Sequence, residues 1–156
     1  MAVIRAVLPD EVADAVALHA RARATYYPDG LPQDGTNWLA AWRSALVRPD
    51  GQVLCVVEEG RMIGLASFRT PEGAPADTVK LFQFHVDPGH WRRGVGSALH
   101  TACVEAWTSD GKRTAVLEVH VGNRRAQLFY RRHGWVPEPA GPGDRHLTMR
   151  LPLTAE

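Results

Sequence analysis

The sequence predicts an α/β fold: a mixed, mostly antiparallel central sheet flanked by about four helices, with a ligand site at the end of the central strand. Short apolar runs rich in β-branched residues alternate with segments of 3.6-residue periodicity. Clusters of proline, glycine and aspartate separate these segments. One strand leads through a basic glycine loop directly into a helix, and sheets of this class bind ligands at such a strand end.

Composition limits how the chain is organised. With 156 residues and 45% hydrophobic content, residues 1–156 are expected to form a single domain with its own core. The formal net charge of +1 gives no global attraction to nucleic acid or to a membrane surface. No apolar run suits a signal peptide or a membrane span. Cys55 and Cys103 lie in apolar segments without C-x-x-C spacing, which favours reduced, structural cysteines and a cytoplasmic location.

The first half of the chain predicts three strands and two helices. The strands are expected over residues 3–7, 52–58 and 61–69, and the helices over residues 10–27 and 37–48. Asp10 is the expected N-cap of the first helix, and Pro28-Asp29-Gly30 should break it. Glu59-Gly60 is the expected turn between the second and third strands.

Four aromatic residues flank the loop between these two helices: Tyr26, Tyr27, Trp38 and Trp42. In one interpretation they pack the helices, because aromatic side chains supply much of the buried area in any small core. In the other, some of them line a groove for a substrate. The packing interpretation is the more general one.

The central strand, expected over residues 79–86, ends at Asp87-Pro88-Gly89 and leads into a basic loop. Arg92, Arg93 and Gly94-Val95-Gly96 precede the start of a helical pattern at Ser97. Glycines let the backbone approach a ligand, the first helical turn presents N–H groups, and arginines suit phosphate oxygens. The loop is therefore a predicted anion site. It is neither a P-loop nor G-x-G-x-x-G, since the residues that define those motifs do not follow.

The second half of the chain continues the alternation of helix and strand. Gly111 is the expected C-cap of the helix after the loop, and a further helix is expected over residues 124–133. Strands are expected over residues 114–121, 135–136 and 145–151. The first of these should bury one face through Ala115, Leu117, Val119 and Val121, with Val116, Glu118 and His120 on the other. This strand, the helix that follows it and the strand-like Trp135-Val136 predict a right-handed βαβ unit.

Three segments of the chain, VDPGHWRRGVGSAL, LEVHVGN and NRRAQLFYRRHGW, resemble the signature segments of the GNAT superfamily of acetyl-CoA-dependent N-acetyltransferases. The order of elements is similar over essentially the whole chain. Within the superfamily, the spacing resembles that of the ribosomal-protein-alanine acetyltransferase type. The resemblance implies acetyl-CoA as cosubstrate and an amine-bearing acceptor as partner, and a homodimer is compatible with it.

The resemblance also implies site residues. Backbone groups of Phe84, His85 and Val86 would bind the pantetheine arm of the cofactor. The pyrophosphate would be cradled by Arg92, Arg93, Gly94, Val95, Gly96 and Ser97. Asn123 and Tyr130 match positions that contact the cofactor in relatives. The chain departs from the family at Trp91, where Gln or Arg is common, so the contribution of that side chain differs here.

Acetylation of an amine needs a group that accepts a proton from the ammonium. Glu118 and His120 lie two residues apart on one strand face, so either could do this directly or through water. The resemblance points to Glu118, which stands five residues before Asn123 as in the alanine-acetyltransferase type. The structural alternative is a solvated or ion-paired carboxylate on the strand.

The departing thiolate needs a proton, and the phenol of Tyr130 can donate one. The family pattern A-x-x-F/L-Y-x-x-x-G supports this role, although Tyr130 also fits a packing position on one helical face with Phe129 and His133. Asn123 can serve as N-cap of the same helix while contacting the cofactor. His85, His120 and His133 lack metal-ligand spacing, so no metal site is expected.

The sequence therefore predicts an N-acetyltransferase that moves an acetyl group from acetyl-CoA to a primary amine, in a ternary complex and without an acyl-enzyme. A non-catalytic acyl-CoA-binding sensor is the alternative. A nucleotide or nucleic-acid phosphate site is disfavoured by the missing Lys-Ser/Thr and by the low net charge. The acceptor is not encoded in a recognisable motif: the loops that should shape its site span residues 28–36 and 137–144.

Overall fold

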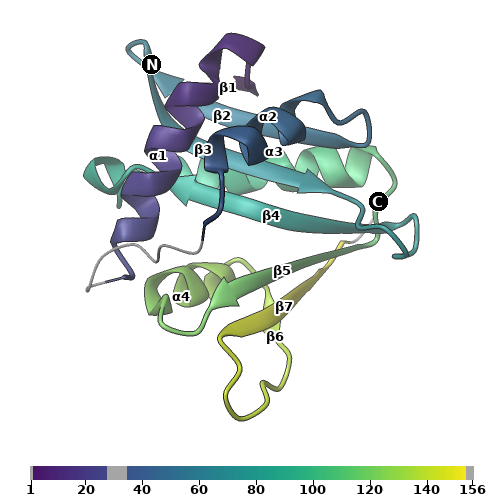
Figure 1. Cartoon of the computed structure of the whole chain (residues 1–156). Coiled ribbons are helices and arrows are strands. Elements are labelled where there is room, and N and C mark those ends of the chain that lie inside the picture. The colour runs from purple at the N-terminus through teal and green to yellow at the C-terminus, as the bar shows by residue number, and fades with distance from the viewer. Residues whose placement is uncertain (1, 28–34, 154–156) are drawn as a thin grey trace. The chain divides into compact units, whose positions relative to one another are not determined.

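The computed structural model describes residues 2–27 and 35–153 (Figure 1). Its strands are β1 (Ala2–Ala6), β2 (Gly51–Glu58), β3 (Arg61–Arg69), β4 (Thr78–Val86), β5 (Thr114–His120), β6 (Val136–Pro137) and β7 (His146–Pro152). Its α-helices are α1 (Val12–Ala24), α2 (Trp38–Val47), α3 (Val95–Ser109) and α4 (Arg124–Arg132). Two single-turn 3₁₀ segments, η1 (Pro9–Glu11) and η2 (Pro88–His90), precede α1 and α3.

In the part of the chain that the structure describes, seven strands form one sheet in the order β1-β2-β3-β4-β5-β7-β6. β4 and β5 are parallel, with register pairs from Thr78↔Thr114 to Leu81↔Leu117. β1 with β2, β5 with β7 and β6 with β7 are antiparallel. The predicted class, a mixed and mostly antiparallel sheet with four helices in the described residues, is confirmed.

The predicted βαβ unit differs in one respect. β5 and β6 run in the same direction, but β7 lies between them and is antiparallel to both. The reason is pairing length: β7 pairs with β5 along seven residues, whereas β6 has two residues to pair. The adjacent parallel strands are β4 and β5, which α3 connects.

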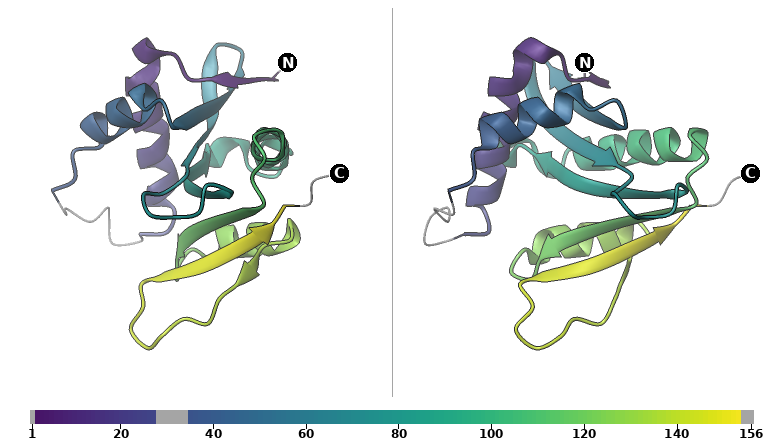
Figure 2. Two further views of the ribbon diagram at one scale, coloured as in Figure 1. Left: turned by 90° about the vertical axis from the view of Figure 1, so that its right-hand side faces the viewer. Right: turned by 45° about the vertical axis from the view of Figure 1, so that its right-hand side comes forward.

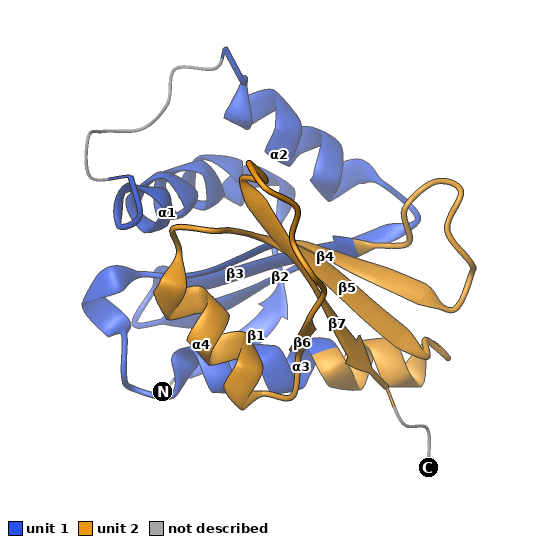
Figure 3. Cartoon of the chain, turned by 90° about the horizontal axis from the view of Figure 1, so that it is seen from below, with its two compact units in different colours: residues 1–68, 83–103 blue, residues 69–82, 104–156 orange. Residues whose placement is uncertain are grey.

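The chain divides into two compact units, coloured separately in Figure 3. Unit 1 comprises Met1–Phe68 and Gln83–Cys103, and unit 2 comprises Arg69–Phe82 and Val104–Glu156. Unit 1 thus contains β1, β2, nearly all of β3, the last part of β4, α1, α2 and the first part of α3. Unit 2 contains the first part of β4, the last part of α3, and β5, α4, β6 and β7.

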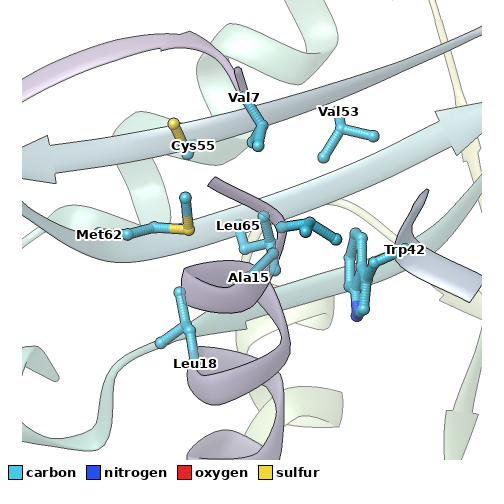
Figure 4. Packing of buried hydrophobic residues seen from close by; sticks show 9 residues of the cluster. Val7, Ala15, Leu18, Trp42, Val53, Cys55, Met62 and Leu65 are labelled. Atoms are coloured by element: carbon cyan, nitrogen blue, oxygen red, sulfur yellow. The ribbon is translucent and has the colours of Figure 1, made fainter. Parts of the chain in front are cut away.

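In unit 1, α1 and α2 cover one face of the strands (Figure 2). Ala15 and Leu18 of α1 and Trp42 of α2 point toward β2 and β3 (Figure 4). The buried residues of this cluster are Val7, Val12, Ala15, Leu18, Trp42, Val53, Cys55, Met62 and Leu65. Fully burying an aliphatic side chain contributes about 1.5–3 kcal/mol, so this apolar face explains why α1 and α2 are held here.

Gly64 of β3 allows a close approach of its neighbours within unit 1. A Cβ built on Gly64 would lie 2.9 Å from Cγ2 of Val56 and 3.5 Å from Cδ2 of Leu99, which belongs to α3. Val56 and Leu99 are both buried. β2, β3 and the first half of α3 therefore pack without room for a side chain at this position.

In unit 2, alternate residues of β5 and β7 form the core. Ala115, Leu117 and Val119 are 0%, 2% and 6% exposed, as predicted for one face of this strand. The prediction for Val121 is wrong: β5 ends at His120, and Val121 is 42% exposed. Trp107 of α3 and Trp135 complete the core, with ring centroids 6.2 Å apart.

The ends of the helices correct one prediction and confirm others. Asp10 is not the N-cap of α1, because the helix begins at Val12 and Glu11 occupies the N-cap position. Glu11 instead accepts a hydrogen bond from the N–H of Leu8 at 2.8 Å and pairs with Arg5 at 2.8 Å. The second helix begins where expected, and Asn37 is its N-cap, accepting from the N–H of Ala40 at 3.0 Å.

The expected turns after β2 and α3 are confirmed, since Glu59, Gly60 and Gly111 have φ of 50°, 77° and 78°. α1 ends at Ala24 rather than Tyr27, and the expected break at Pro28-Asp29-Gly30 lies outside the described residues. Among the described residues, no helix has the length and apolar character needed to cross a membrane.

Candidate active site

The loop from β4 to α3 belongs to unit 1 and has the geometry of an anion site. Gly94 has φ 81°, a conformation that glycine adopts without strain, and Arg92 also has a positive φ of 66°. The first helical hydrogen bond runs from the N–H of Ala98 to the carbonyl of Gly94 at 3.0 Å. The N–H groups before Ala98 therefore belong to the open first turn of α3, the part of a helix that attracts anions.

The charged and small residues of this loop are accessible. Arg92, Arg93, Gly94 and Ser97 are exposed, and Val95 and Gly96 are half-buried in the first turn of α3. The structure thus places all six residues expected around the pyrophosphate in one continuous segment of unit 1. Two guanidinium groups and an open helix turn are a donor set that fits a diphosphate.

Trp91, the departure from the family pattern, ties this loop to the end of β4. Its indole Nε1–H donates to the carbonyl of Val86 at 3.1 Å. The residues expected to bind the pantetheine arm, Phe84, His85 and Val86, are the last three residues of β4 and are half-buried. The carbonyl of Val86 therefore already has a partner within the chain, which the sequence did not predict.

Asp87 anchors the same loop to its surroundings. Its carboxylate is hydrogen-bonded to the ring of His90 at 3.0 Å and lies 3.4 Å from Nε of Arg21 on α1. Its N–H donates to the carbonyl of Ile63 in β3 at 2.9 Å. Asp87 is 7% exposed, so these contacts satisfy a buried carboxylate and fix where the loop begins.

Glu118, the expected proton acceptor, lies on β5 in unit 2 and is ion-paired. Its Oε1 is 2.7 Å from Nζ of Lys80, and its side chain is 49% exposed. The hydrogen bond from Lys80 is the largest effect on this carboxyl and lowers its pKa below the usual value. Sequence reasoning missed Lys80, although the parallel register pairs it with Val116 and so places it on the same sheet face as Glu118.

His120, the other candidate on this face, is held by its own turn. Its Nδ1 accepts a hydrogen bond from the N–H of Gly122 at 2.9 Å, which leaves the proton of the neutral ring on Nε2. Burial, together with the nearby His146 and Arg145, lowers the pKa of His120. The ring of His146 lies 5.8 Å away, edge to face.

Asn123 is the N-cap of α4 and Tyr130 lies within this helix, both in unit 2. The side chain of Asn123 caps the helix, accepting from the N–H of Ala126 at 3.2 Å, as the N-cap interpretation predicts. Tyr130 is 6% exposed and packs edge to face against Trp135 and Phe129, with centroid distances of 5.8 and 5.5 Å. The packing interpretation of Tyr130 is therefore satisfied, and its expected proton-donor role stays a prediction.

A second polar cluster, in unit 1, was not predicted. His19 of α1 stacks near His85 of β4, with ring centroids 4.6 Å apart, and its Nδ1 accepts from the indole Nε1–H of Trp42 at 3.1 Å. Burial, with a smaller contribution from the charge of Arg23, lowers the pKa of His19 to about 4. Burial also lowers the pKa of His85, with contributions from His19 and Arg23. Both imidazoles are therefore neutral near pH 7.

Arg23 lies one helical turn after His19 and is 8% exposed. Its guanidinium lies 4.8 Å from the ring centroid of Trp38 and 5.8 Å from that of Tyr27. Trp42 is 2% exposed and belongs to the core, so the packing interpretation holds for it. Tyr26, Tyr27 and Trp38 are half-buried around the cluster. The i, i+4 spacing of His19 and Arg23 was the available signal for this cluster.

Residues 15–135 match the family described as Acetyltransferase (GNAT) family. Mycothiol acetyltransferase of Beutenbergia cavernae is 27% identical over 129 residues, which are 78% of this chain and 40% of that protein. The chain thus spans less than half the length of this curated relative.

Solved structures share the fold. PaiA N-acetyltransferase from Thermoplasma acidophilum, in complex with coenzyme A, matches with a TM-score of 0.81 at 15% identity, covering 97% of this chain and 99% of that one. The ribosomal-protein-S18-alanine N-acetyltransferase from Escherichia coli matches with a TM-score of 0.78 at 21% identity, covering 100% and 96%. The predicted resemblance, including the alanine-acetyltransferase type among structural neighbours, is confirmed.

Proposed function

Because the chain belongs to the acetyltransferase (GNAT) family, whose N-acetyltransferases use acetyl-CoA, we propose that it transfers the acetyl group to a primary amine of a small molecule, peptide or protein. The observation that carries the proposal is the loop from β4 to α3. Its exposed Arg92 and Arg93, the positive φ of Gly94 and the open first turn of α3 are suited to the pyrophosphate of the cofactor. The family match covers parts of both units, which supports one domain over residues 1–156.

Direct attack in a ternary complex is the proposed mechanism. Acetyl-CoA supplies a thioester whose carbonyl carbon accepts the amine nitrogen, and the carbon–sulfur bond then breaks. An acyl-enzyme would require a reactive nucleophile such as a cysteine thiolate. Cys55 and Cys103 are both 0% exposed, and burial raises the pKa of each thiol. Neither is therefore suited to receive the acetyl group. A cytoplasmic location stays an expectation.

In this proposal Glu118 accepts the proton that leaves the amine. A partly exposed carboxylate held ionised beside Lys80 is available to accept it at neutral pH. Tyr130 donates a proton or a hydrogen bond to the departing sulfur. Phe84, His85 and Val86 hold the pantetheine arm, and Asn123 contacts the cofactor while it caps α4.

The test is a panel of amines incubated with acetyl-CoA, in which released thiol is measured. Thiol release that depends on one class of amine would establish the acceptor. The second candidate, a non-catalytic acyl-CoA-binding sensor, predicts a rise in melting temperature with acetyl-CoA but no amine-dependent thiol release. A homodimer and the absence of nucleic-acid binding stay expectations, which sedimentation and a gel-shift experiment would test.

A further inference from the structure

Arg23 is a buried cation without an anionic partner in the described structure. The residue is 8% exposed, and its guanidinium faces the rings of Trp38 and Tyr27. Across residues 2–27 and 35–153, no carboxylate lies within ion-pair distance of it. Arginine is rarely buried unless it is paired, because removing a charge from water costs several kcal/mol per ion.

Among the described residues, the groups that face Arg23 supply no negative charge. The phenol of Tyr26 is hydrogen-bonded to it, and burial raises the pKa of that phenol, so Tyr26 is neutral at physiological pH. His19 and His85 are neutral imidazoles within electrostatic reach of the guanidinium. The cluster thus holds one fixed positive charge among neutral aromatic and imidazole rings.

Hydrogen bonds fix the orientation of the two imidazoles. The side-chain carbonyl of Gln83 accepts from Nε2 of His85 at 2.7 Å, so Nδ1 of the neutral ring carries a lone pair. In His19 the indole of Trp42 occupies Nδ1, so its Nε2 carries the proton. The cluster that contains Arg23 therefore includes two imidazoles whose donor and acceptor atoms are fixed by hydrogen bonds, together with aromatic rings.

We infer that Arg23 binds a carboxylate carried by the acceptor amine, so that the acceptor is an amino acid or another amine with a free carboxylate. This inference rests on the proposed acetyl transfer. A guanidinium presents two parallel N–H groups that match a carboxylate, and one carboxylate balances one unpaired cation. A phosphate would bring more negative charge than Arg23 alone balances, since His19 and His85 are uncharged. His85 lies on the part of β4 proposed to hold the pantetheine arm, which places the ligand beside the acetyl donor within unit 1.

Matched acids and amides test the inference by turnover. Glycine, β-alanine and 4-aminobutyrate each differ from their carboxamides only in the charged group, and they place it at increasing distance from the amine. In the wild-type protein, kcat/KM should be about 10–100-fold higher for at least one acid than for its amide, the range expected for a hydrogen bond between charged groups. R23Q should remove this preference, and R23K should retain part of it. Equal rates for every acid and its amide in the wild type would overturn the inference.

Binding of a product-like acid separates this inference from the proposed function. N-acetylglycine has no free amine to acetylate, so calorimetric titration against N-acetylglycinamide, in the presence of CoA, needs no turnover. Selective binding of the acid that R23Q abolishes would support the carboxylate site even if no amine were acetylated. Acetyl transfer to amines without selective binding of the acid would leave the proposed function intact and contradict the inference.

Two controls separate ligand binding from packing. Arg43 is an exposed arginine on α2, so R43Q removes the same charge without touching the cluster and should keep the acid preference. If R23Q lowers the melting temperature but keeps the acid preference, Arg23 is a packing residue and the inference is wrong. If R23Q does not fold, the wild-type preference and its reduction in R23K decide the matter.

Discussion

The hydrogen bond from Lys80 lowers the pKa of Glu118. A general base must be deprotonated to act, so activity falls as the pH drops through its pKa. Because Lys80 lowers that pKa, its removal in K80M should let the pKa rise and move the acid limb of the kcat/KM profile to higher pH. The measurement is kcat/KM against pH for both proteins. E118Q should lower the rate by about 10²-fold and remove that limb.

One result would contradict the role of Glu118 as proton acceptor. If E118Q keeps the wild-type rate and profile, the carboxylate is a surface ion pair, and His120 or solvent accepts the proton. H120Q is then the informative variant: the lone pair on Nδ1 of His120 accepts from the N–H of Gly122, so proton uptake by this ring requires that hydrogen bond to break.

Tyr130→Phe separates a donor hydroxyl from a packing ring. The phenylalanine ring keeps the edge-to-face contacts with Trp135 and Phe129, so the melting temperature and acetyl-CoA affinity should change little. Turnover should fall, because the thiolate leaves without its hydrogen bond. A thiol has a lower pKa than a phenol, about 8.5 against about 10, so partial rather than full proton transfer is expected. Near wild-type turnover would show that Tyr130 only packs.

At the residue scale, the sequence identified residues whose roles follow from local motifs. Asn123 precedes a helix and caps it as predicted. Lys80 and Arg23 were missed for two different reasons. The partner of Lys80 is far away in sequence, so the pair depends on strand register. Arg23 lies on a helix, where an arginine is ordinarily expected at the surface, and its burial depends on the aromatic residues of α2 and the preceding loop.

The loop between β4 and α3 yields a prediction at the element scale. Gly94 has a positive φ, so a bulky residue there is strained, and its side chain would stand where a phosphate approaches the backbone. Replacing Gly94 and Gly96 by bulky residues should abolish the rise in melting temperature with acetyl-CoA, while the unliganded protein stays folded. Normal CoA binding by this variant would show that the phosphate site lies elsewhere.

Gly64 tests the packing of β2, β3 and α3. Gly64→Ala places a Cβ 2.9 Å from Val56, so the free energy of unfolding should fall by about 1–3 kcal/mol, as for overpacked cores. Val56→Ala in the same chain should restore part of the loss, which denaturant titration can measure. Gly89→Ala is a matched control, since its Cβ would meet only Oδ2 of Asp87 at 3.8 Å. Equal stability of G64A and wild type would contradict the tight packing.

Elements were predictable where local chemistry decides them. The turn at Glu59-Gly60 and the C-cap at Gly111 follow from residues that tolerate positive φ. The start of α1 was not predictable from Asp10, because Arg5 and Leu8 engage Glu11 instead. The insertion of β7 between β5 and β6 is also invisible in local pattern, because strand order depends on pairing between distant segments.

For the molecule as a whole, buried titratable groups predict sensitivity to acid. The folded-state pKa of His19 is about 4 against 6.5, so between these values the unfolded chain binds more protons than the folded one. Stability therefore falls as the pH drops through this window. The pKa of Glu11, lowered to about 2 from 4.5 by its hydrogen bonds with Arg5 and the Leu8 N–H, extends the loss to lower pH with the same sign.

Urea titrations across this range provide the measurement. H19Q keeps an acceptor for the indole of Trp42 but takes up no proton, so its stability should depend less steeply on pH than that of the wild type. Parallel slopes for H19Q and wild type would mean that His19 is not a neutral buried group.

The burial of both cysteines affects how thiol release by this protein can be measured. Reagents that detect CoA colorimetrically attack thiolates, and the folded chain offers none: Cys55 and Cys103 are 0% exposed, and burial raises the pKa of Cys103 to about 12. The background in a thiol-release assay therefore comes from the amine and buffer, not from the catalyst. The same reagent also reports unfolding of the protein, because each unfolded chain adds two reactive thiols to the signal.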